Sequence, residues 1–292
     1  ISDFVSEYSR GRTPNPCVRC NQYIKFGALL NKARSLDCDY LATGHYARIV
    51  PSHQSPPACR QTGVTNHQYL LKKGKDKTKD QSYFLYCIKK EVLSKILFPL
   101  GDYTISQVRS LANSLRLPVA EKPGSQEICF ILDADYRRFL ERRLSQIKKD
   151  IKPGPVMDLE GKILGQHKGI AFYTIGQREG LGISAKMRLY VIRMDARGNI
   201  IFVGEEKDTY SQRLIASKLN FISIDFPRRL LAVKAKIRYN HQEARAKLSP
   251  LSGRKIMIEF KQPQKAITPG QSVVFYDKDV VLGGGIIESS LQ

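Results

Sequence analysis

The sequence predicts an α/β amino-terminal half, followed by a β-rich carboxyl-terminal half that ends in a small β-barrel. In the first half, residues 24–36 carry apolar side chains at helical spacing, and the short apolar run 39–46 follows directly. In the second half, residues 231–240 form an expected strand in which apolar and basic side chains alternate strictly from Val233 to Arg238, and further short strands are expected at 255–260 and 272–288. Short strands at such close spacing are typical of a small barrel.

The helix expected at 24–36 has a single apolar face, made of Phe26, Leu29, Leu30, Ala33 and Leu36. The strand at 39–46 stops at Gly44-His45. Ligands bind at the carboxyl ends of strands in open α/β sheets, so these two residues are candidates for a binding site. Residues 51–63 are rich in Pro, Ser and Gln, which indicates an exposed loop.

A lysine-rich stretch and a well-marked helix come next. Residues 69–86 crowd five lysines into one loop: Lys72, Lys73, Lys75, Lys77 and Lys79. Thr104 and Gln107 form a capping box, which starts a helix. Its apolar face comprises Val108, Leu111, Ala112 and Leu115. Residues 121–132 are expected to form a turn and then a buried strand that carries Cys129.

A basic helix is expected within residues 133–152, and a linker at 152–155, where Pro and Gly cluster. Residues 189–205 predict a β-hairpin with a Gly-containing turn. The inward face of the helix comprises Leu140, Leu144, Ile147 and Ile151, which leaves most of its Arg and Lys side chains for solvent or phosphate. In the strand 231–240, one face carries Val233, Ala235 and Ile237, and the other Lys234, Lys236 and Arg238.

The composition describes a strongly basic globular protein. The 292 residues include 48 Lys and Arg against 27 Asp and Glu, a net charge of +21. A hydrophobic content of 42% excludes a disordered chain, a collagen and a small disulfide scaffold. No apolar run approaches the ~20 residues of a membrane-spanning helix, and the first ten residues lack signal-peptide features. A polyanion is the expected partner, nucleic acid rather than a membrane.

The six cysteines suggest metal binding or thiol chemistry rather than a disulfide framework, because their spacing is irregular and no secretion signal precedes them. The pair Cys17-x-x-Cys20 leaves a zinc site open as an alternative. A structural zinc site wants four Cys or His ligands, often as two such pairs, and the sequence has no second pair. We therefore expect no bound metal. The six are Cys17, Cys20, Cys38, Cys59, Cys87 and Cys129.

Several sequence blocks, in order along nearly the whole chain, carry specific information. The first reads Gly-Arg-Thr-Pro-Asn-Pro-Cys-Val-Arg-Cys-Asn, and a later one reads Gly-Ser-Gln-Glu-Ile-Cys-Phe. Together the blocks resemble the tRNA-specific 2-thiouridylases, which place sulfur on C2 of the wobble uridine of tRNA. They lie at 11–21, 24–26, 42–46, 79–84, 124–130, 165–169, 173–178, 180–182, 269–272 and 283–287.

The resemblance implies three domains. These are the carboxyl-terminal part of a nucleotide-binding domain of the adenine-nucleotide α-hydrolase-like (PP-loop ATPase) kind at 1–132, a central domain at 133–206, and a tRNA-binding β-barrel at 207–292. The family's Ser-Gly-Gly-Val-Asp-Ser loop, which grips phosphate, does not occur in this sequence. We therefore expect an amino-terminally truncated member that adenylates its substrate poorly, since the backbone N–H groups of that loop cradle pyrophosphate.

The resemblance also implies the chemistry. ATP, with Mg²⁺, places AMP on the C2 oxygen, and a cysteine persulfide supplies sulfur, with no resident metal or organic cofactor. Cys129 matches the persulfide position and Cys20 the partner nucleophile, so the two would form a transient disulfide or release sulfide. From residue chemistry alone, a buried structural thiol is the competing interpretation of Cys129. At Cys17 some relatives carry Asp, which puts any carboxylate role there in doubt.

The same matching assigns the binding residues. Gly44 falls at a nucleotide contact, where a missing Cβ permits close approach. For His45, the competing interpretation is a structural histidine. For the triplet at 79–81 it is a solvated charged loop, and for Arg238 and Tyr239 it is an ordinary exposed strand. The matched tRNA contacts are Asn15, Pro16, Cys17, His45, Lys79, Asp80, Gln81, Arg238, Tyr239 and Gln271.

The expected partners are the anticodon loop of tRNA and a sulfur-relay protein or cysteine desulfurase. We expect a monomer, with the cytoplasm as the default location and an organelle left open. One alternative is a truncated, catalytically inactive tRNA-binding module, in which the thiols are bystanders. Another is an ATP-loop enzyme for a small amide substrate, which explains neither the charge nor the paired cysteines.

Overall fold

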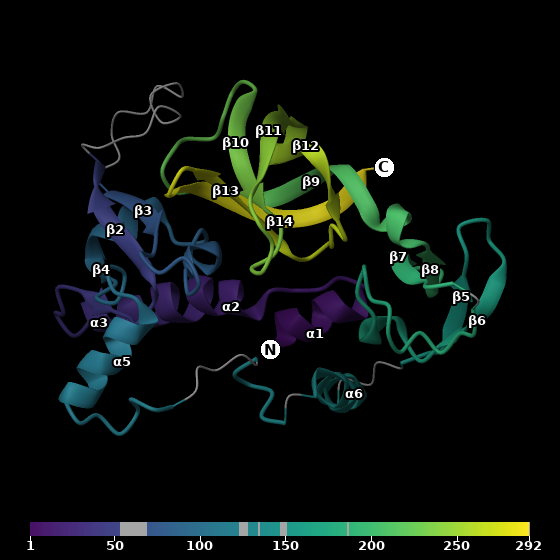
Figure 1. Ribbon diagram of the computed structural model, residues 1–292, viewed down its shortest axis with the longest axis horizontal. Helices are drawn as coiled ribbons and strands as arrows, with labels where there is room; N and C mark the ends of the chain where they lie inside the picture. Colours follow the sequence, from purple (N-terminus) through teal and green to yellow (C-terminus); the bar gives the residue numbers. More distant parts are fainter. Residues whose placement is uncertain (53–68, 123–127, 134, 147–150, 186, 292) are drawn as a thin grey trace.

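The computed structural model describes residues 1–52, 69–122, 128–133, 135–146, 151–185 and 187–291. A run of helices near the amino terminus passes beneath a β-barrel, with a small mixed sheet at one end and a β-hairpin at the other (Figure 1). No helix in these ranges is both long enough and apolar enough to cross a bilayer. The loop expected at 51–63 falls almost entirely outside the described residues.

The helical run differs in its winding from the helix expected at 24–36. It continues through a π-helical stretch with i→i+5 hydrogen bonds. Its two buried residues, Asn21 and Phe26, are five positions apart, in keeping with that winding. Leu30 is buried, but Leu29 and Leu36 are 46% and 61% exposed, so the expected single face is wrong at these two positions. The run comprises α2 (Pro16–Arg19), η1 (Cys20–Leu29) and α3 (Leu30–Arg34), preceded by α1 (Ser2–Ser9).

A two-stranded parallel sheet lies beside this helical run. The strand expected at 39–46 is reduced to β1 (Leu41–Ala42), which pairs with β4 (Ile96–Leu97). Thr43 N–H still donates to the Leu97 carbonyl at 3.0 Å, and the chain then leaves the sheet at Gly44. Two 3₁₀ helices, η3 (Ser82–Phe84) and η4 (Lys90–Lys95), precede β4 in the chain.

Helix α5 (Ile105–Ser114) confirms the capping box of Thr104 and Gln107. The helix buries no residue completely: Val108 and Ala112 on its apolar face are half-buried, whereas Leu111 and Leu115 are exposed. The buried strand expected within 121–132 is wrong where the structure describes it. Cys129 lies exposed in a turn, closed by a bond from Ile131 N–H to the Ile128 carbonyl at 2.9 Å.

The central part combines a basic helix with a four-stranded sheet. Helix α6 (Tyr136–Gln146) buries Leu140 and Leu144 and exposes its arginines, as expected. The hairpin expected at 189–205 is confirmed, whereas the linker expected at 152–155 already contains the start of β5. The sheet order is β6-β5-β8-β7, with β5 (Gly154–Met157), β6 (Ile163–His167), β7 (Tyr190–Asp195) and β8 (Ile200–Gly204), flanked by η5 (Ile170–Phe172) and η6 (Glu206–Thr209).

The expected small barrel is confirmed. Six strands follow the order β13-β10-β11-β12-β9-β14, and pairing of β13 with β14 closes the ring. Val233 and Ala235 in β10, and Ile237 directly after it, point into the core, as the alternation predicts. The strands are β9 (Tyr210–Phe221), β10 (Leu231–Lys236), β11 (Ala244–Leu251), β12 (Lys255–Lys265), β13 (Ser272–Asp277) and β14 (Val280–Leu291), with η7 (Ser252–Arg254) between β11 and β12.

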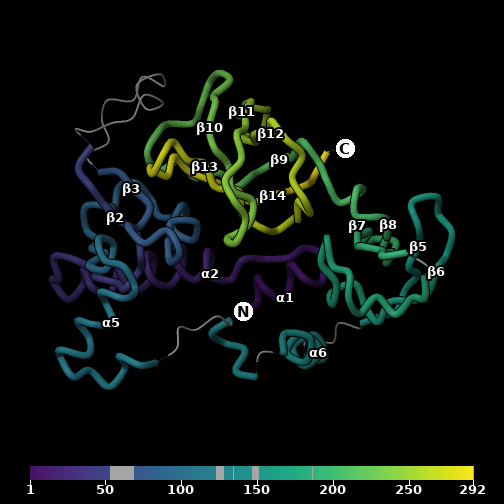
Figure 2. Tube along the Cα trace, in the orientation of Figure 1, coloured from purple at the N-terminus to yellow at the C-terminus, as the bar shows by residue number. Residues whose placement is uncertain are grey.

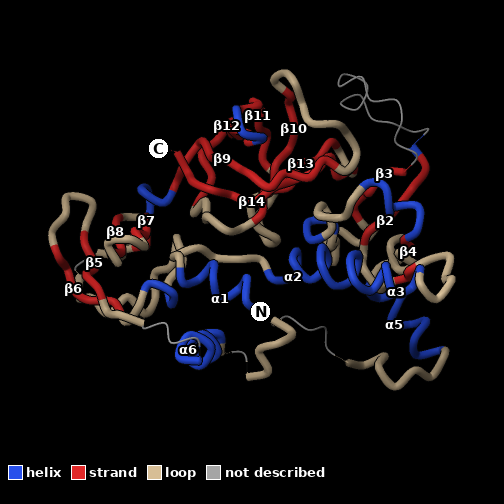
Figure 3. Tube along the Cα trace, turned by 180° about the vertical axis from the view of Figure 1, so that it is seen from behind, coloured by secondary structure: helices blue, strands red, loops and turns tan. Residues whose placement is uncertain are grey.

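The barrel sheet continues into the amino-terminal half, as the view from behind also shows (Figure 3). The hairpin of β2 (Ala47–Pro51) and β3 (Tyr69–Lys73) adds to β14, where Val280 pairs with Lys72. The Asp279 carboxylate, in the turn before β14, lies 3.2 Å from Arg48 and 3.1 Å from Lys72. The two halves of the chain therefore share one eight-stranded sheet.

A buried tyrosine links the amino-terminal half to the barrel. The Tyr83 hydroxyl donates to the Ser272 carbonyl at 2.8 Å, and the side chain is fully buried. Tyr83→Phe removes the donor and leaves a buried carbonyl short of a partner. We expect the free energy of unfolding in urea to fall by about 1–2 kcal/mol. Tyr23→Phe is the matched control, because Tyr23 is 59% exposed, and an equal loss in both variants would contradict the assignment.

Candidate functional site

The carboxyl-terminal barrel holds the segment that starts the helical run. Thr13 N–H donates to the Pro269 carbonyl at 2.9 Å. Gln271 Nε2 donates to the carbonyls of Thr13 and Pro14 at 3.0 and 3.2 Å. Gly270 has φ +92°, and a Cβ there would meet Thr13 backbone atoms at 2.9–3.0 Å, so only glycine fits. The chain between α1 and α2 passes directly beneath β14 (Figure 2).

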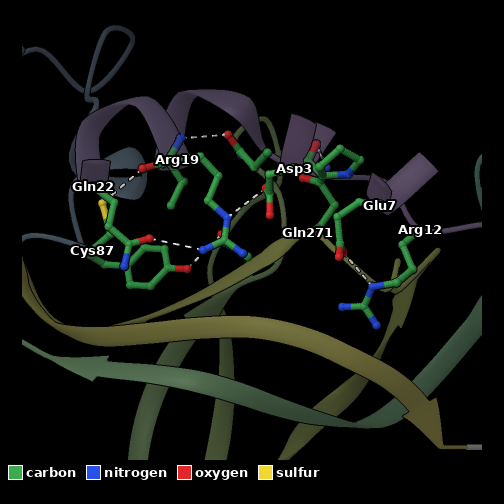
Figure 4. A network of polar contacts seen from close by, with 12 residues as sticks. Asp3, Glu7, Arg12, Arg19, Gln22, Cys87 and Gln271 are labelled. Atoms are coloured by element: carbon green, nitrogen blue, oxygen red, sulfur yellow. Dashed lines mark hydrogen bonds and ion pairs between the residues drawn. The ribbon is translucent and has the colours of Figure 1, made fainter. Parts of the chain in front are cut away.

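The first turn of the helical run is fixed from both sides. The Asn15 side chain accepts the Val18 N–H at 3.2 Å, and Pro16 takes the first helical position. Arg19 Nε lies 3.2 Å from Asp3 on α1, and Arg19 Nη1 donates to Gln22 at 3.1 Å (Figure 4). This turn carries Cys17 and Cys20, whose backbone positions are therefore well defined.

Cys17 and Cys20 lie on this turn, and Cys129 comes near enough to act on Cys17 electrostatically. Cys17 and Cys129 are exposed and Cys20 is half-buried. Desolvation is the largest cause of the raised pKa of Cys17, followed by the charges of Cys129 and Cys20. The fold thus brings Cys129 within electrostatic reach of residues far away in the sequence. All three are free thiols, so the expected Cys20–Cys129 disulfide is not formed in this structure.

A fourth cysteine near the turn is inert. Cys87 is buried, and its Sγ contacts the Val18 carbonyl at 3.4 Å (Figure 4). Burial raises the pKa of its thiol to about 12, so it stays protonated. No group of three His, Cys, Asp or Glu side chains in the described ranges is arranged to hold a metal ion.

Lys25 places a positive charge on the same face of the helix. Its Nζ lies 3.2 Å from His45 Nε2, and its charge opposes the rise in the pKa of Cys17. An ammonium can only donate, so His45 Nε2 accepts and the ring proton sits on Nδ1, facing Thr43 Oγ1 at 2.7 Å. Burial lowers the pKa of His45 to about 4, with help from Lys25. A neutral imidazole therefore positions the ammonium.

Of the two candidate residues that follow β1, His45 is buried and Gly44 is exposed. His45 is 6% exposed and packs between Phe26 and Phe98, so its expected contact with tRNA stays a prediction. Gly44 is exposed, and a Cβ there would meet only Leu100, at an ordinary 3.5 Å. Packing within the described residues therefore does not demand glycine at 44, and its expected contact with a nucleotide stays a prediction.

The triplet Lys79-Asp80-Gln81 also separates by role. Lys79 is exposed and projects from the lysine-rich loop. The Asp80 carboxylate is buried and accepts from the N–H groups of Gly74 and Ser82, at 3.0 and 3.1 Å. Gln81 Oε1 accepts the N–H of Tyr46 at 3.0 Å. Asp80 and Gln81 thus shape the loop that presents Lys79.

The barrel contributes an open hollow of about 350 Å³ at the junction with the central part. Arg238 turns inward there: its Nη2 donates to the carbonyls of Ile175 and Ala266, at 3.2 and 2.9 Å. Tyr239 packs on Phe84, with ring centroids 4.6 Å apart, and stays half-buried. The hollow is lined by Thr13, Thr174, Arg238, Tyr239, Asn240, His241 and Gln271.

Three residues of the site were missed by sequence reasoning. Lys25 lies within the block 24–26, but nothing in the sequence indicates that this lysine lies near the cysteines. Thr43 was only one residue of the strand expected at 39–46, and Arg19 was only one of the two residues between Cys17 and Cys20. Their roles depend on contacts with His45 and Asp3 that spacing does not reveal.

Because His45 is buried and neutral, lowering the pH should reduce the stability of the folded protein. Its pKa of about 4 lies below the ordinary 6.5, so the unfolded chain binds more protons between these values. The free energy of unfolding should fall as the pH drops through this window, by up to about 3 kcal/mol from His45. His45→Gln should flatten that dependence in urea titrations from pH 7 to 4. A pH dependence as steep in His45→Gln as in wild type would contradict this assignment.

Comparison with known proteins gives matches over the whole chain. Three family models match consecutive segments: a tRNA methyl transferase HUP domain at 1–133, a tRNA methyl transferase PRC-barrel domain at 137–205, and an aminomethyltransferase β-barrel domain at 211–287. The chain therefore combines a HUP-type domain with a PRC-barrel domain and a carboxyl-terminal barrel.

Curated relatives are similar over the same span. A tRNA-specific 2-thiouridylase MnmA 2 from Thermoanaerobacter sp. is 51% identical over 292 residues, which is 100% of this chain and 76% of the relative. MnmA 1 from Caldanaerobacter subterraneus is 52% identical with the same coverage, and MnmA from Acetivibrio thermocellus is 50% identical over 99% of this chain and 76% of its own length. On this similarity, the chain belongs to the tRNA-specific 2-thiouridylase family.

Proposed function

We propose that this protein is a tRNA sulfurtransferase that replaces the C2 oxygen of the wobble uridine with sulfur, using ATP and a persulfide on Cys129. The observation that carries the proposal is that Cys20 and Cys129, far apart in the sequence, both lie close enough to Cys17 to raise the pKa of its thiol. The relatives named above are thiouridylases. Their names favour a transferase over a tRNA-binding module with bystander thiols.

Activation of the base needs a better leaving group on its C2 oxygen. ATP, supplied with Mg²⁺, would provide it by transferring AMP to that oxygen. Gly44 is suited to lie against the nucleotide, because it is exposed at the carboxyl end of β1 and its missing Cβ is not demanded by packing. Lys25, held by His45, places an ammonium near the thiols where negative charge develops.

Sulfur transfer then uses the two cysteines. The terminal sulfur of the Cys129 persulfide attacks C2, and AMP leaves with the former C2 oxygen. The Cys20 thiolate next attacks Cys129 Sγ, which frees the sulfur on the base and leaves a Cys20–Cys129 disulfide. In the other route, the same attack releases sulfide first, and sulfide adds to C2. A sulfur-relay protein or a cysteine desulfurase would load Cys129.

Binding of the anticodon loop would use the exposed basic surface. Lys75, Lys77 and Lys79 project from one loop, and α6 exposes a row of arginines. Extruding the wobble base costs a few kcal/mol, which phosphate contacts can offset. Tyr239 offers an aromatic face at the edge of the hollow, while Arg238 and Gln271 hold the walls in place. Asn15, Pro16 and Cys17 are proposed to meet the base itself.

The decisive experiment is intact mass after incubation with a cysteine desulfurase and cysteine. Wild type should gain the mass of one sulfur atom, because Cys129 is exposed, and Cys129→Ala should gain none. Cys38→Ser is the matched control, since Cys38 is also exposed but hydrogen-bonds only the nearby Leu36 carbonyl. A gain retained in Cys129→Ala would overturn the assignment, as would wild type without any gain.

Lys79 tests the tRNA surface. Lys79→Ala removes one exposed cation, so the salt dependence of tRNA binding should lose about 0.7–0.9 from its slope in log Kd against log salt. Affinity should fall at low salt and converge with wild type at high salt. Filter binding over a salt series measures this. Lys247→Ala is the control, because Lys247 is an exposed lysine on β11, and equal slopes in all three proteins would count against the proposed tRNA surface.

A further inference from the structure

The open hollow at the barrel junction is used above only through Tyr239 at its edge. It holds about 350 Å³ and lies where three parts of the chain meet: Thr13 of the amino-terminal segment, Thr174 of the central part, and the barrel turn 238–241. This volume is typical of pockets that bind small molecules. Thr13 also comes shortly before Asn15, which caps the helix turn of the candidate site. A group in the hollow is therefore a close neighbour of a group bound at that turn.

The walls of the hollow are fixed by hydrogen bonds within the chain. His241 N–H donates to the Arg238 carbonyl at 3.1 Å, which closes the barrel turn. The Oγ1 atoms of Thr13 and Thr174 lie 3.0 Å apart, so one hydroxyl bonds the other and joins the amino-terminal segment to the central part. Gln271 Nε2 holds the Thr13 carbonyl at 3.0 Å. The folded chain thus forms the hollow without help from a ligand.

The lining groups match the parts of a nucleotide. The side-chain hydrogen bonds of Arg238 within the described chain all start from Nη2, and no described carboxylate pairs with it, so Nε and Nη1 remain for a phosphate. Asn240 is exposed and carries a donor and an acceptor, as a neutral His241 does. Burial and the charges of Arg238 and Lys236 lower the pKa of His241, which favours that neutral form. Tyr239 adds an aromatic ring at the edge.

We propose that the hollow binds one nucleotide of the anticodon loop directly next to the wobble uridine, and that Asn240 and His241 read the edge of its base. This inference rests on the proposed function, which places the wobble uridine at the turn that Asn15 caps. Arg238 holds the phosphate of the neighbouring nucleotide, and Tyr239 stacks on its base. Proteins read single-stranded RNA loops in this way, by splaying bases out, stacking them on aromatic rings and bonding their edges.

A base fits the hollow better than a bare anion or an apolar ligand does. A phosphate alone engages Arg238 but leaves the amide of Asn240 and the imidazole of His241 without a partner. An apolar ligand desolvates all three side chains and pairs none of them, which is unfavourable. Two adjacent side chains that can each donate and accept are suited to the mixed donors and acceptors on the edge of a base.

Abasic RNAs locate the bound nucleotide. Anticodon stem-loops carry one abasic site, either 5′ or 3′ of the wobble uridine, and fluorescence anisotropy gives their Kd at one salt concentration. One of the two should bind wild type about tenfold more weakly than the intact loop, because stacking and edge contacts are lost together. Asn240→Ala should bind the intact loop about fivefold more weakly, yet bind that abasic loop within about twofold of wild type, since the contacted base is gone. Additive losses for both abasic loops, or no abasic loss in wild type, would overturn the inference.

Base selectivity supplies a readout that a merely structural role does not move. Exchanging the base at the located position should change the wild-type Kd about fivefold or more between the best and the worst base. The double variant Asn240→Ala, His241→Phe should bind these loops about equally, because phenylalanine keeps a ring but has no donor or acceptor. Gln242→Ala is the matched control, since Gln242 is exposed beside the turn and does not line the hollow, and it should keep the wild-type selectivity.

The outcomes separate this inference from the proposed function. Equal selectivity in wild type and the double variant overturns the inference alone, and so does a Gln242→Ala variant that loses as much as Asn240→Ala. Sulfur loading of Cys129 by a desulfurase is a separate measurement that changes at the hollow should leave intact. Failure of wild type to take up sulfur overturns the proposed function, whereas failure to bind any of the loops overturns both.

Discussion

The site depends on the hydrogen bonds by which the barrel loop 269–271 holds residues 13 and 14. These bonds fix the chain just before Asn15 caps the helix, and thereby set where Cys17 and Cys20 lie. The absence of a Cβ at Gly270 permits this close approach. The carboxyl-terminal barrel therefore helps to build the candidate site, because it positions a turn that belongs to the amino-terminal domain.

Electrostatics within the site follow from one buried imidazole. Because His45 is neutral, the Lys25 ammonium faces an acceptor rather than a competing cation. A second cation at His45 would repel Lys25 and move it out of reach of Cys17. The packing of Phe26 and Phe98 around the ring, which desolvates it, thus helps to hold a positive charge near Cys17.

Local patterns in the sequence predicted the regular elements well. Alternation identified the inward face of β10, and the capping box identified the start of α5. The exposed Leu29 was not predicted, because periodicity analysis assumes 3.6 residues per turn and this segment is wound as a π-helix. Cys129 was expected in a buried strand, because its apolar neighbours outweighed the turn that the structure shows. The roles of Lys25 and Arg238 depend on tertiary contacts, which no spacing encodes.

The sheet shared by the barrel and the hairpin β2–β3 limits how the protein can be divided. Strand β14 contacts β3 on the side that a separated barrel would expose, and the ion pairs at Asp279 would be lost with it. Excision of the barrel would therefore create an unprotected strand edge on each fragment, and such edges promote aggregation. Although the family models match as three consecutive segments, the amino-terminal and carboxyl-terminal ones are not interchangeable modules in this chain.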